Sequence, residues 1–294
     1  MTMTMTLLDG GMGQELITRS PDAATPLWAT RVMMDHPELV RAVHDDFFAA
    51  GADVATTNTY AILPDRIETY DLADKLVELH EAACQIACEA RDNHGSGEVL
   101  GALGPMGWSY RADMAPPADE AAVIYEQIAR IQAPFVDRFI IETMSGIDQA
   151  RGALMGALSV GKPVWLGLSV DDVDGAKMRS GEPLADALEL LSDLRPEAVL
   201  INCSVPEAVD TALPVIARAG LPFGAYANGF TKITTNFAAK GATVDSLSAR
   251  TDLPPERYAD FAASWQAQGA TLIGGCCEVG PDHIRALAHR LKGA

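Results

Sequence analysis

Short apolar segments alternate with longer amphipathic segments along most of this chain. The short segments are rich in Val, Ile and Leu and are predicted to be buried strands, whereas the longer ones repeat apolar residues at helical spacing. Such alternation favours strand–helix–strand units in a parallel sheet. The predicted strands lie at residues 7–8, 53–60, 99–103, 138–143, 163–170, 198–203, 221–228 and 270–274.

Helices are predicted between these strands. They lie at residues 39–48, 71–93, 121–136, 147–160, 184–194, 208–219, 256–268 and 282–291. Eight strands with intervening helices indicate an α/β protein, a single-domain (β/α)₈ barrel over residues 1–294, and a chain of 294 residues suits that fold. A doubly wound open sheet is the alternative, because the helix after the third strand is weakly marked.

Composition narrows the classes of function. The chain is 48% hydrophobic and carries a net charge of −18. It has no cluster of Lys or Arg, so binding to nucleic acid or to an anionic membrane is not expected. There is no apolar run of about 18 residues to span a membrane, and the amino terminus does not resemble a secretory signal. With five cysteines in no secreted framework, we expect a cytoplasmic protein, a monomer or small homo-oligomer, that acts on small molecules.

Two adjacent cysteines, Cys276 and Cys277, follow Gly274 and Gly275 at the end of the eighth predicted strand. Adjacent cysteines rarely bond to each other, so a soft metal explains them better, with zinc as the leading candidate. Cys203 ends the sixth strand and is predicted to be the third ligand. Three protein ligands leave one zinc position open, as in catalytic sites. The alternative is that these cysteines are buried and inert.

A zinc ion held by three thiolates is a weak Lewis acid. It suits the binding and deprotonation of a substrate thiol, whose sulfur then stays nucleophilic. That chemistry favours attack on an activated carbon such as the methyl group of a sulfonium. The two glycines are expected to let the backbone turn, so that both neighbouring thiols point at one ion.

Two carboxylates are predicted at the same mouth. Asp9 follows the first strand, and Glu142 directly follows the apolar residues of the fourth. Both are expected to hold a substrate ammonium; the alternatives are a turn or helix cap, or a pair with a nearby Arg. The backbone N–H groups of Gly10 and Gly11 could approach a carboxylate. The six histidines show no metal spacing and are expected to be surface or capping residues.

At this point the chain resembles the homocysteine S-methyltransferase family over nearly its whole length. The order and spacing of several short motifs carry the resemblance. They are Asp9-Gly10-Gly11-Met12, Pro26-Leu27-Trp28, His36-Pro37-Glu38-Leu39-Val40, Ala50-Gly51-Ala52-Asp53, Thr57-Asn58-Thr59-Tyr60, Gly104-Pro105, Glu142-Thr143, Asn202-Cys203-Ser204 and Gly274-Gly275-Cys276-Cys277.

The resemblance implies a zinc-dependent barrel that methylates homocysteine to methionine. It makes Zn²⁺ the cofactor and the three cysteines its ligands and catalytic residues. Asp9 and Glu142 would hold the amino group of homocysteine, and the backbone from Gly10 to Met12 would face its carboxylate. Asn228 is similar to an asparagine that some members keep near the metal, where it would fill the open zinc position before the thiol arrives.

The resemblance also bears on the methyl donor. Betaine-using members have Tyr after the matching Glu and a long later segment, whereas this chain has Thr143 and ends at Ala294. Cobalamin-dependent synthases carry further modules. S-methylmethionine or S-adenosylmethionine is therefore preferred, with Asn58 in the substrate site and the rings of Trp28 and Tyr60 facing the sulfonium cation. Packing at the barrel rim is the alternative for both rings.

Other functions remain open from the sequence. The same fold could use betaine, a corrinoid-bound methyl group or another thiol acceptor. From a different class, the chain could bind zinc or thiols without turnover. Residues 171–183 and 229–255 are candidate lids, because both segments are long and contain glycine.

Overall fold

A computed structural model describes the chain except for residues 1–4, 24, 26, 232, 234–246 and 294. Most of the candidate lid at residues 229–255 therefore lies outside the described residues. The described strands are β1 (Thr6–Leu7), β2 (Val54–Thr56), β3 (Glu98–Leu103), β4 (Arg138–Met144), β5 (Val164–Leu168), β6 (Ala198–Asn202), β7 (Phe223–Ala227) and β8 (Leu272–Gly275).

Helices follow or separate the strands. The described α-helices are α1 (Met12–Arg19), α2 (Ala29–Asp35), α3 (Pro37–Ala49), α4 (Pro64–Ile67), α5 (Leu76–His94), α6 (Ala118–Gln132), α7 (Ile147–Leu158), α8 (Ala187–Leu194), α9 (Pro206–Ile216), α10 (Pro255–Ala267) and α11 (Pro281–Lys292). The described 3₁₀ helices are Glu68–Tyr70, Ala73–Lys75, Ala112–Met114, Leu184–Asp186 and Ala217–Ala219.

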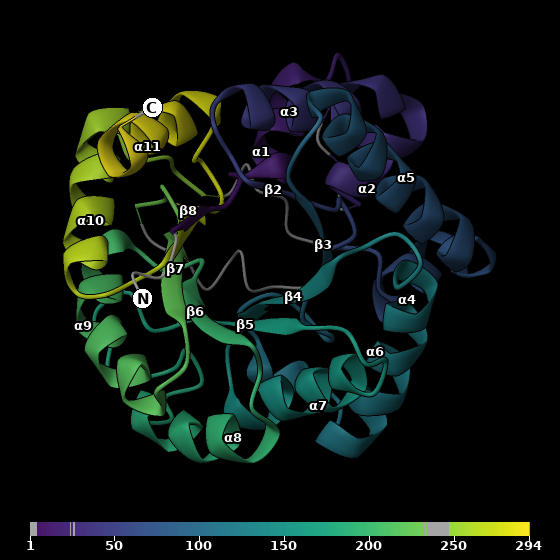
Figure 1. The fold of residues 1–294 in the computed structure, drawn as a ribbon. Coiled ribbons are helices and arrows are strands. Elements are labelled where there is room, and N and C mark those ends of the chain that lie inside the picture. Colours follow the sequence, from purple (N-terminus) through teal and green to yellow (C-terminus); the bar gives the residue numbers. More distant parts are fainter. Residues whose placement is uncertain (1–4, 24, 26, 232, 234–246, 294) are drawn as a thin grey trace.

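The strands form one parallel sheet that curves into a barrel. Strands β2 to β8 pair in chain order, and β8 pairs with β1. The short strand β1 meets the β2 side through Asp53, whose backbone N–H donates to Leu7 O at 2.7 Å and whose side chain accepts from Leu7 N at 2.7 Å. The helices form a ring outside the strands (Figure 1). This arrangement confirms the barrel and excludes the open-sheet alternative.

The core has two layers because side chains alternate across each strand. On β4, Phe139 and Ile141 pack against the helices, whereas Ile140 packs inside the barrel. On β6, Val199 faces outward and Leu200 inward in the same way. This period of two carries Glu142 to the inner side at the end of β4. The mouth of the barrel therefore receives polar residues from strands whose other positions are apolar.

Several predicted boundaries differ from the structure. Helices α1 and α2 have eight and seven residues and were not predicted, because so few turns give little periodic signal. Helix α5 begins at Leu76 rather than residue 71, since 3₁₀ turns come before it. The second strand ends at Thr56, and the chain then turns along the mouth.

The surface expectation for histidine was wrong at two positions. His44 is 1% exposed and His80 is fully buried. They lie on the inward faces of α3 and α5, among the buried residues of each helix. At these positions an imidazole occupies a place where helical periodicity leads one to expect an apolar side chain. His80 still satisfies its polar atoms, since its Nε2 lies 2.9 Å from Ile62 O and its Nδ1 lies 3.2 Å from Gln132 Nε2.

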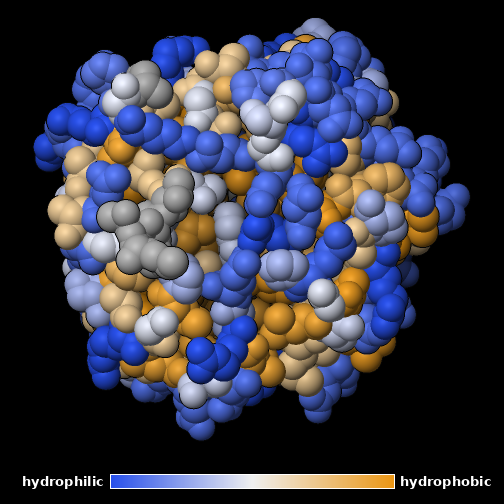
Figure 2. All heavy atoms as spheres, viewed as in Figure 1, coloured by the Kyte–Doolittle hydropathy of each residue, from blue (hydrophilic) through white to orange (hydrophobic). Residues whose placement is uncertain are grey.

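Figure 2 shows hydrophilic residues over much of this face, with hydrophobic residues between them and across the lower part of the view. None of the helices in the described part of the chain has the length and apolar character that a membrane crossing needs.

Candidate active site

A cavity opens at the carboxyl ends of the strands, the end where barrel enzymes carry their active sites. Eleven of the twelve predicted site residues line it. They are Asp9, Gly10, Gly11, Met12, Trp28, Asn58, Tyr60, Glu142, Cys203, Cys276 and Cys277. The twelfth, Asn228, is not part of the lining that the described residues form.

The three predicted metal ligands come together on one side of the cavity, which we call the sulfur wall (Cys203, Cys276 and Cys277). Their sulfur atoms all lie within 4.8 Å of one another. Cys203 follows β6 and the other two follow β8, with only β7 between these strands. The cluster can therefore hold a metal ion, because three sulfur ligands face one point.

Two sulfur atoms of the sulfur wall are placed so that they can oxidise together. Cys203 and Cys276 are paired in the structure with Cα atoms 5.8 Å apart, which is within disulfide reach, and Cys277 is free. Burial raises the pKa of the Cys277 thiol to about 12, and the charges of Glu278 and Glu142 add to this effect. A thiol in this setting ionises at neutral pH when a cation stabilises the thiolate, as a metal ion held by the reduced cluster would do.

Glycines bring the two ends of the chain against each other beneath the sulfur wall. A Cβ on Gly11 would lie 2.5 Å from Cys276 O, and one on Gly274 would lie 2.5 Å from Leu8 Cβ. The expectation that Gly274 and Gly275 supply a turn was wrong: both belong to β8, and neither has a positive φ. Both allow close approach: a side chain on Gly274 would push the cysteine-bearing segment away from Leu8 and Asp9, and one on Gly275 would collide with Val279.

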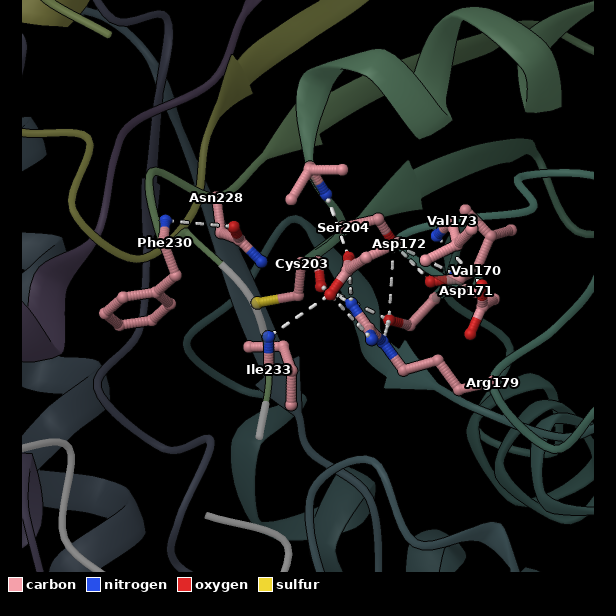
Figure 3. A network of polar contacts seen from close by, with 12 residues as sticks. Val170, Asp171, Asp172, Val173, Arg179, Cys203, Ser204, Asn228, Phe230 and Ile233 are labelled. Atoms are coloured by element: carbon pink, nitrogen blue, oxygen red, sulfur yellow. Dashed lines mark hydrogen bonds and ion pairs between the residues drawn. The ribbon is translucent and has the colours of Figure 1, made fainter. Parts of the chain in front are cut away.

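A buried ion pair holds the backbone of Cys203 in place. Arg179 donates from Nη2 to Asp172 at 2.7 Å and to Cys203 O at 2.9 Å, and both members of the pair are 9% exposed. Asp172 also accepts from the backbone N–H groups of Val205 and Ile233, each at 3.2 Å. Figure 3 shows Arg179 extending to this junction. The loop after β5 therefore ties the Cys203 backbone to the segment after β7.

Asn228 lies beside this network but differs from the other predicted site residues. It is fully buried, and its Oδ1 accepts from Phe230 N at 3.1 Å. Its Nδ2 has no hydrogen-bond partner among the described residues. Figure 3 shows the amide directed toward the side chain of Cys203. A role for Asn228 at the metal stays a prediction.

Asp9 has a structural role at the floor of the cavity. Thr56 donates to its carboxylate from the backbone N–H at 2.6 Å and from the hydroxyl at 2.7 Å, which links β1 to β2. Burial still raises the pKa of Asp9 to about 6, against the lowering effect of these bonds. A carboxylate has about four acceptor positions, so Asp9 keeps capacity for a ligand.

Glu142 faces Asp9 from the other side of the floor. Removal from water and, to a smaller extent, the nearby charge of Asp9 raise the pKa of Glu142 to about 8, against the lowering effect of the Tyr226 hydroxyl. Two carboxyl groups held this close favour a cation between them, because its charge would relieve both the burial and the mutual repulsion. The floor is therefore suited to bind an ammonium group.

The side of the cavity across from Cys203 is aromatic, and we call it the aromatic wall (Tyr60, Arg66 and Trp108). The Arg66 guanidinium lies 5.5 Å from the Tyr60 ring centre and 5.2 Å from that of Trp108. Trp28 meets the Tyr60 ring edge to face, with ring centres 6.1 Å apart. The sequence predicts that the Tyr60 ring faces a sulfonium. In the structure, one face of this ring is occupied by the Arg66 guanidinium.

Strained backbone is concentrated around this cavity. Four of the seven described non-glycine residues with positive φ line it: Trp28, Tyr110, Thr143 and Cys203. Such conformations cost energy and persist where the surroundings enforce them, which is common at functional sites. At Cys203, with φ of 48°, the enforcing contact is the bond from Arg179 to its carbonyl.

Two arginines near the site are not predicted from the sequence. Arg66 lies on the short helix α4, and Arg179 lies in the polar loop of residues 171–183, for which the sequence predicts only a candidate lid. Neither belongs to a motif. Strand periodicity gives a weak indication of Tyr226. Side chains alternate along β7, and Tyr226 falls on the side that faces the interior of the barrel.

Comparison with known proteins agrees with this geometry. The sequence profile described as homocysteine S-methyltransferase matches residues 6–291. The homocysteine S-methyltransferase of Escherichia coli is 30% identical, over 97% of this chain and 94% of that protein. The protein named homocysteine S-methyltransferase YbgG of Bacillus subtilis is 27% identical, over 98% and 94%.

Solved structures show the same likeness. The metallated form of the homocysteine methyltransferase MmuM from E. coli superposes with a TM-score of 0.82 at 26% identity, over 98% of this chain and 97% of that one. Its oxidised form gives a TM-score of 0.81, over 97% and 96%. The profile match over nearly the whole length, together with the barrel and its three-cysteine cluster, means that this chain is an enzyme of the methyltransferase class and belongs to the homocysteine S-methyltransferase family.

Proposed function

We propose that the enzyme transfers a methyl group from a sulfonium donor, S-methylmethionine or S-adenosylmethionine, to the thiol of L-homocysteine to give methionine. It does so within a single barrel domain, residues 1–294, with a zinc ion bound by Cys203, Cys276 and Cys277. The observation that carries the proposal is the convergence of three sulfur atoms, within 4.8 Å of one another, beside a floor with two carboxyl groups.

Zinc suits this ligand set, because thiolates are among its preferred ligands and three of them leave one position for a substrate. When bound, the ion would lower the pKa of the homocysteine thiol so that it reacts as a thiolate at neutral pH. Asp9 and Glu142 would hold the homocysteine ammonium, and the backbone of Gly10 and Gly11 would face its carboxylate. These residues keep the sulfur of the acceptor at the sulfur wall.

The reaction is a direct displacement. The homocysteine sulfur forms a bond to the methyl carbon with its own electron pair, and the carbon–sulfur bond of the donor breaks with its pair returning to the donor sulfur. The sulfonium becomes a neutral thioether, and the proton of the homocysteine thiol leaves to solvent. The remaining task of the protein is to hold donor and acceptor in line, which can supply a large part of the rate.

A donor panel tests the proposal. Reduced, zinc-loaded enzyme would be incubated with homocysteine and, separately, S-methylmethionine, S-adenosylmethionine, betaine or a methylated corrinoid, and methionine would be measured by mass spectrometry. Methionine from a sulfonium is expected. Methionine from betaine or the corrinoid alone would overturn the donor assignment, and zinc-free protein with full activity would overturn the metal.

The acceptor assignment has its own test in Glu142→Gln. Loss of a charged partner for the ammonium should raise KM for homocysteine by roughly 10- to 100-fold, with KM for the donor little changed. A matched change at an exposed position of the barrel wall, Glu126→Gln, should alter neither KM. An increase in KM for the donor alone would place Glu142 at the wrong substrate.

A further inference from the structure

The aromatic wall contains a cation that no carboxylate of the described residues neutralises. Arg66 takes part in none of the ion pairs formed within the described part of this strongly acidic chain. Its only hydrogen bonds to described residues come from Nη2, to Pro105 O at 2.9 Å and to Ser109 Oγ at 3.4 Å. Nε is buried and has no partner among the described residues. A cation held this way favours an anionic ligand.

The surroundings hold the guanidinium firmly in place at the cavity. The ring centres of Tyr60 and Trp108 lie 5.5 and 5.2 Å from the guanidinium carbon. Ser109 connects Arg66 to Tyr60, because its hydroxyl accepts from Arg66 and lies 2.8 Å from the Tyr60 hydroxyl. Arg66, Tyr60, Trp108 and Ser109 all line the cavity. The planar fork of arginine matches a carboxylate, and packing between rings lowers the cost of ordering it.

More polar atoms of the cavity lining have no partner among the described residues. The indole N–H of Trp28, the amide oxygen of Gln14 and the hydroxyl of Thr25 are buried without a hydrogen bond to any described residue, and all three side chains line the cavity. Buried polar groups are nearly always paired in native proteins. Donors and acceptors without partners in one cavity lining indicate a polar ligand that carries both kinds of group.

The position of Arg66 decides which substrate it serves. Helix α4 follows β2, and β2 lies across the eight-stranded ring from β6, which carries Cys203. In the proposed function, homocysteine has its sulfur at the sulfur wall and its ammonium at Asp9 and Glu142. Its carboxylate then faces the Gly10–Gly11 backbone and does not need Arg66. The anion at Arg66 therefore belongs to the second substrate.

We propose that Arg66 binds the carboxylate of the methyl donor, so that the site selects sulfonium donors of the amino-acid type over simple sulfonium cations. This rests on the proposed function. A donor without a carboxylate would bring its positive charge next to an unneutralised guanidinium and be repelled. A donor with one places opposite charge at Arg66 and leaves its sulfonium free to face the acceptor sulfur.

The test compares two donors in two proteins. S-methylmethionine would be set against its decarboxylated analogue, (3-aminopropyl)dimethylsulfonium, in wild type and Arg66→Met. In the wild type, kcat/KM should favour the carboxylated donor by roughly 10- to 100-fold. In Arg66→Met this preference should fall to within a few-fold, with KM for homocysteine unchanged. Arg66→Lys, which keeps the charge, should retain part of the preference.

A matched control is Arg257→Gln. Arg257 is an exposed arginine on α10, packed on the Phe261 ring at 5.1 Å and away from the cavity lining. It should leave the donor preference as in the wild type. Equal thermal unfolding and equal zinc content of all variants would show that Arg66→Met folds.

Equilibrium binding separates this inference from the proposed function. Calorimetry with S-methylmethionine alone, where no acceptor allows turnover, should show binding to wild type and its loss in Arg66→Met. An unchanged preference in Arg66→Met, or a rise in KM for homocysteine instead of the donor, would overturn the role of Arg66. If no sulfonium gives methionine but S-methylmethionine binds in an Arg66-dependent way, the donor-site proposal stands and the proposed function fails. No binding by the wild type overturns both.

Discussion

The sulfur wall and the aromatic wall face the same cavity but are built in different ways. The sulfur wall stands on the ends of β6 and β8, whose positions are determined by a parallel sheet. The aromatic wall comes from the chain that follows β2 and β3, including the four-residue helix α4. Strand ends can hold a metal-binding group within narrow limits, whereas loops can change without disturbing the barrel.

This difference suggests a division of labour. The chemistry that every member of such a family shares would reside on the rigid strand ends, and the choice of partner would reside on the loops. The floor, with Asp9 and Glu142, connects the two walls. Changes on the sulfur wall should therefore abolish the reaction, and changes elsewhere should alter affinity or stability by smaller amounts.

The largest effect is expected for Cys277→Ser on the sulfur wall. Loss of one of three thiolates should bring bound zinc to background levels and lower kcat/KM on the order of 10³-fold. Metal analysis and methionine formation would measure both. Cys88→Ser, at a half-buried cysteine on α5, is the control and should keep its zinc. Full zinc binding by Cys277→Ser would contradict the ligand assignment.

A redox change should act on the same wall. Because Cys203 and Cys276 can join as a disulfide, oxidised protein should bind no zinc until a thiol reductant is added. Zinc uptake and free-thiol counts before and after reduction would measure this. In Cys203→Ser only the adjacent Cys276 and Cys277 remain, which rarely bond to each other, so an oxidant should no longer lower the count of free thiols in the sulfur wall. Equal zinc uptake by oxidised and reduced wild type would count against shared use of these sulfurs.

Arg179→Met should loosen the sulfur wall without removing a ligand. It leaves Asp172 buried without its cation and frees the Cys203 carbonyl, at a cost of about 3 kcal/mol in unfolding free energy. Zinc affinity should fall roughly 10- to 100-fold, as for other groups that orient metal ligands. Denaturant unfolding and zinc competition would be measured. Arg130→Met, which breaks an exposed pair with Glu126, should cost under about 1 kcal/mol and leave zinc affinity intact.

Glu142→Gln should remove from the floor the group that titrates near pH 8. The folded-state pKa of Glu142 is raised to about 8 from the ordinary 4.5, so the stability it contributes is present below about pH 4.5 and is lost as pH rises through about 8. Without substrates, the stability of the variant relative to wild type should therefore rise between about pH 4.5 and pH 8 and stay constant at higher pH. Thermal unfolding of both proteins from pH 5 to 9 would measure the difference. A constant difference would contradict the raised pKa.

The smallest change is expected for Thr56→Val beneath the floor. It removes the hydroxyl that donates to Asp9 at 2.7 Å but keeps the backbone N–H that donates at 2.6 Å. We expect a loss of about 1 kcal/mol in unfolding free energy and little change in zinc content. A large loss of zinc would mean that the floor and the sulfur wall are more tightly coupled than their contacts indicate.

The site was predicted unevenly from the sequence for a physical reason. Asp9, Glu142 and Cys203 each stand at the end of an apolar run, and the ends of parallel strands meet on one face, so their convergence follows from the strand pattern alone. Arg66 and Arg179 have no such constraint. They reach the site through the path of a loop and a short helix, which local sequence does not determine.

The sequence by itself indicated the barrel, the strand-end residues and the reason to expect a thiolate-bound metal, because the periods of strand and helix and the place of each cysteine at the end of an apolar run are local properties. Only the tertiary structure decided why Gly11 and Gly274 have no side chain, how Arg179 holds Cys203, and that Arg66 stands unneutralised between two rings. Each of these depends on which distant segments touch. Such contacts are set by packing of the whole chain, which no single segment encodes.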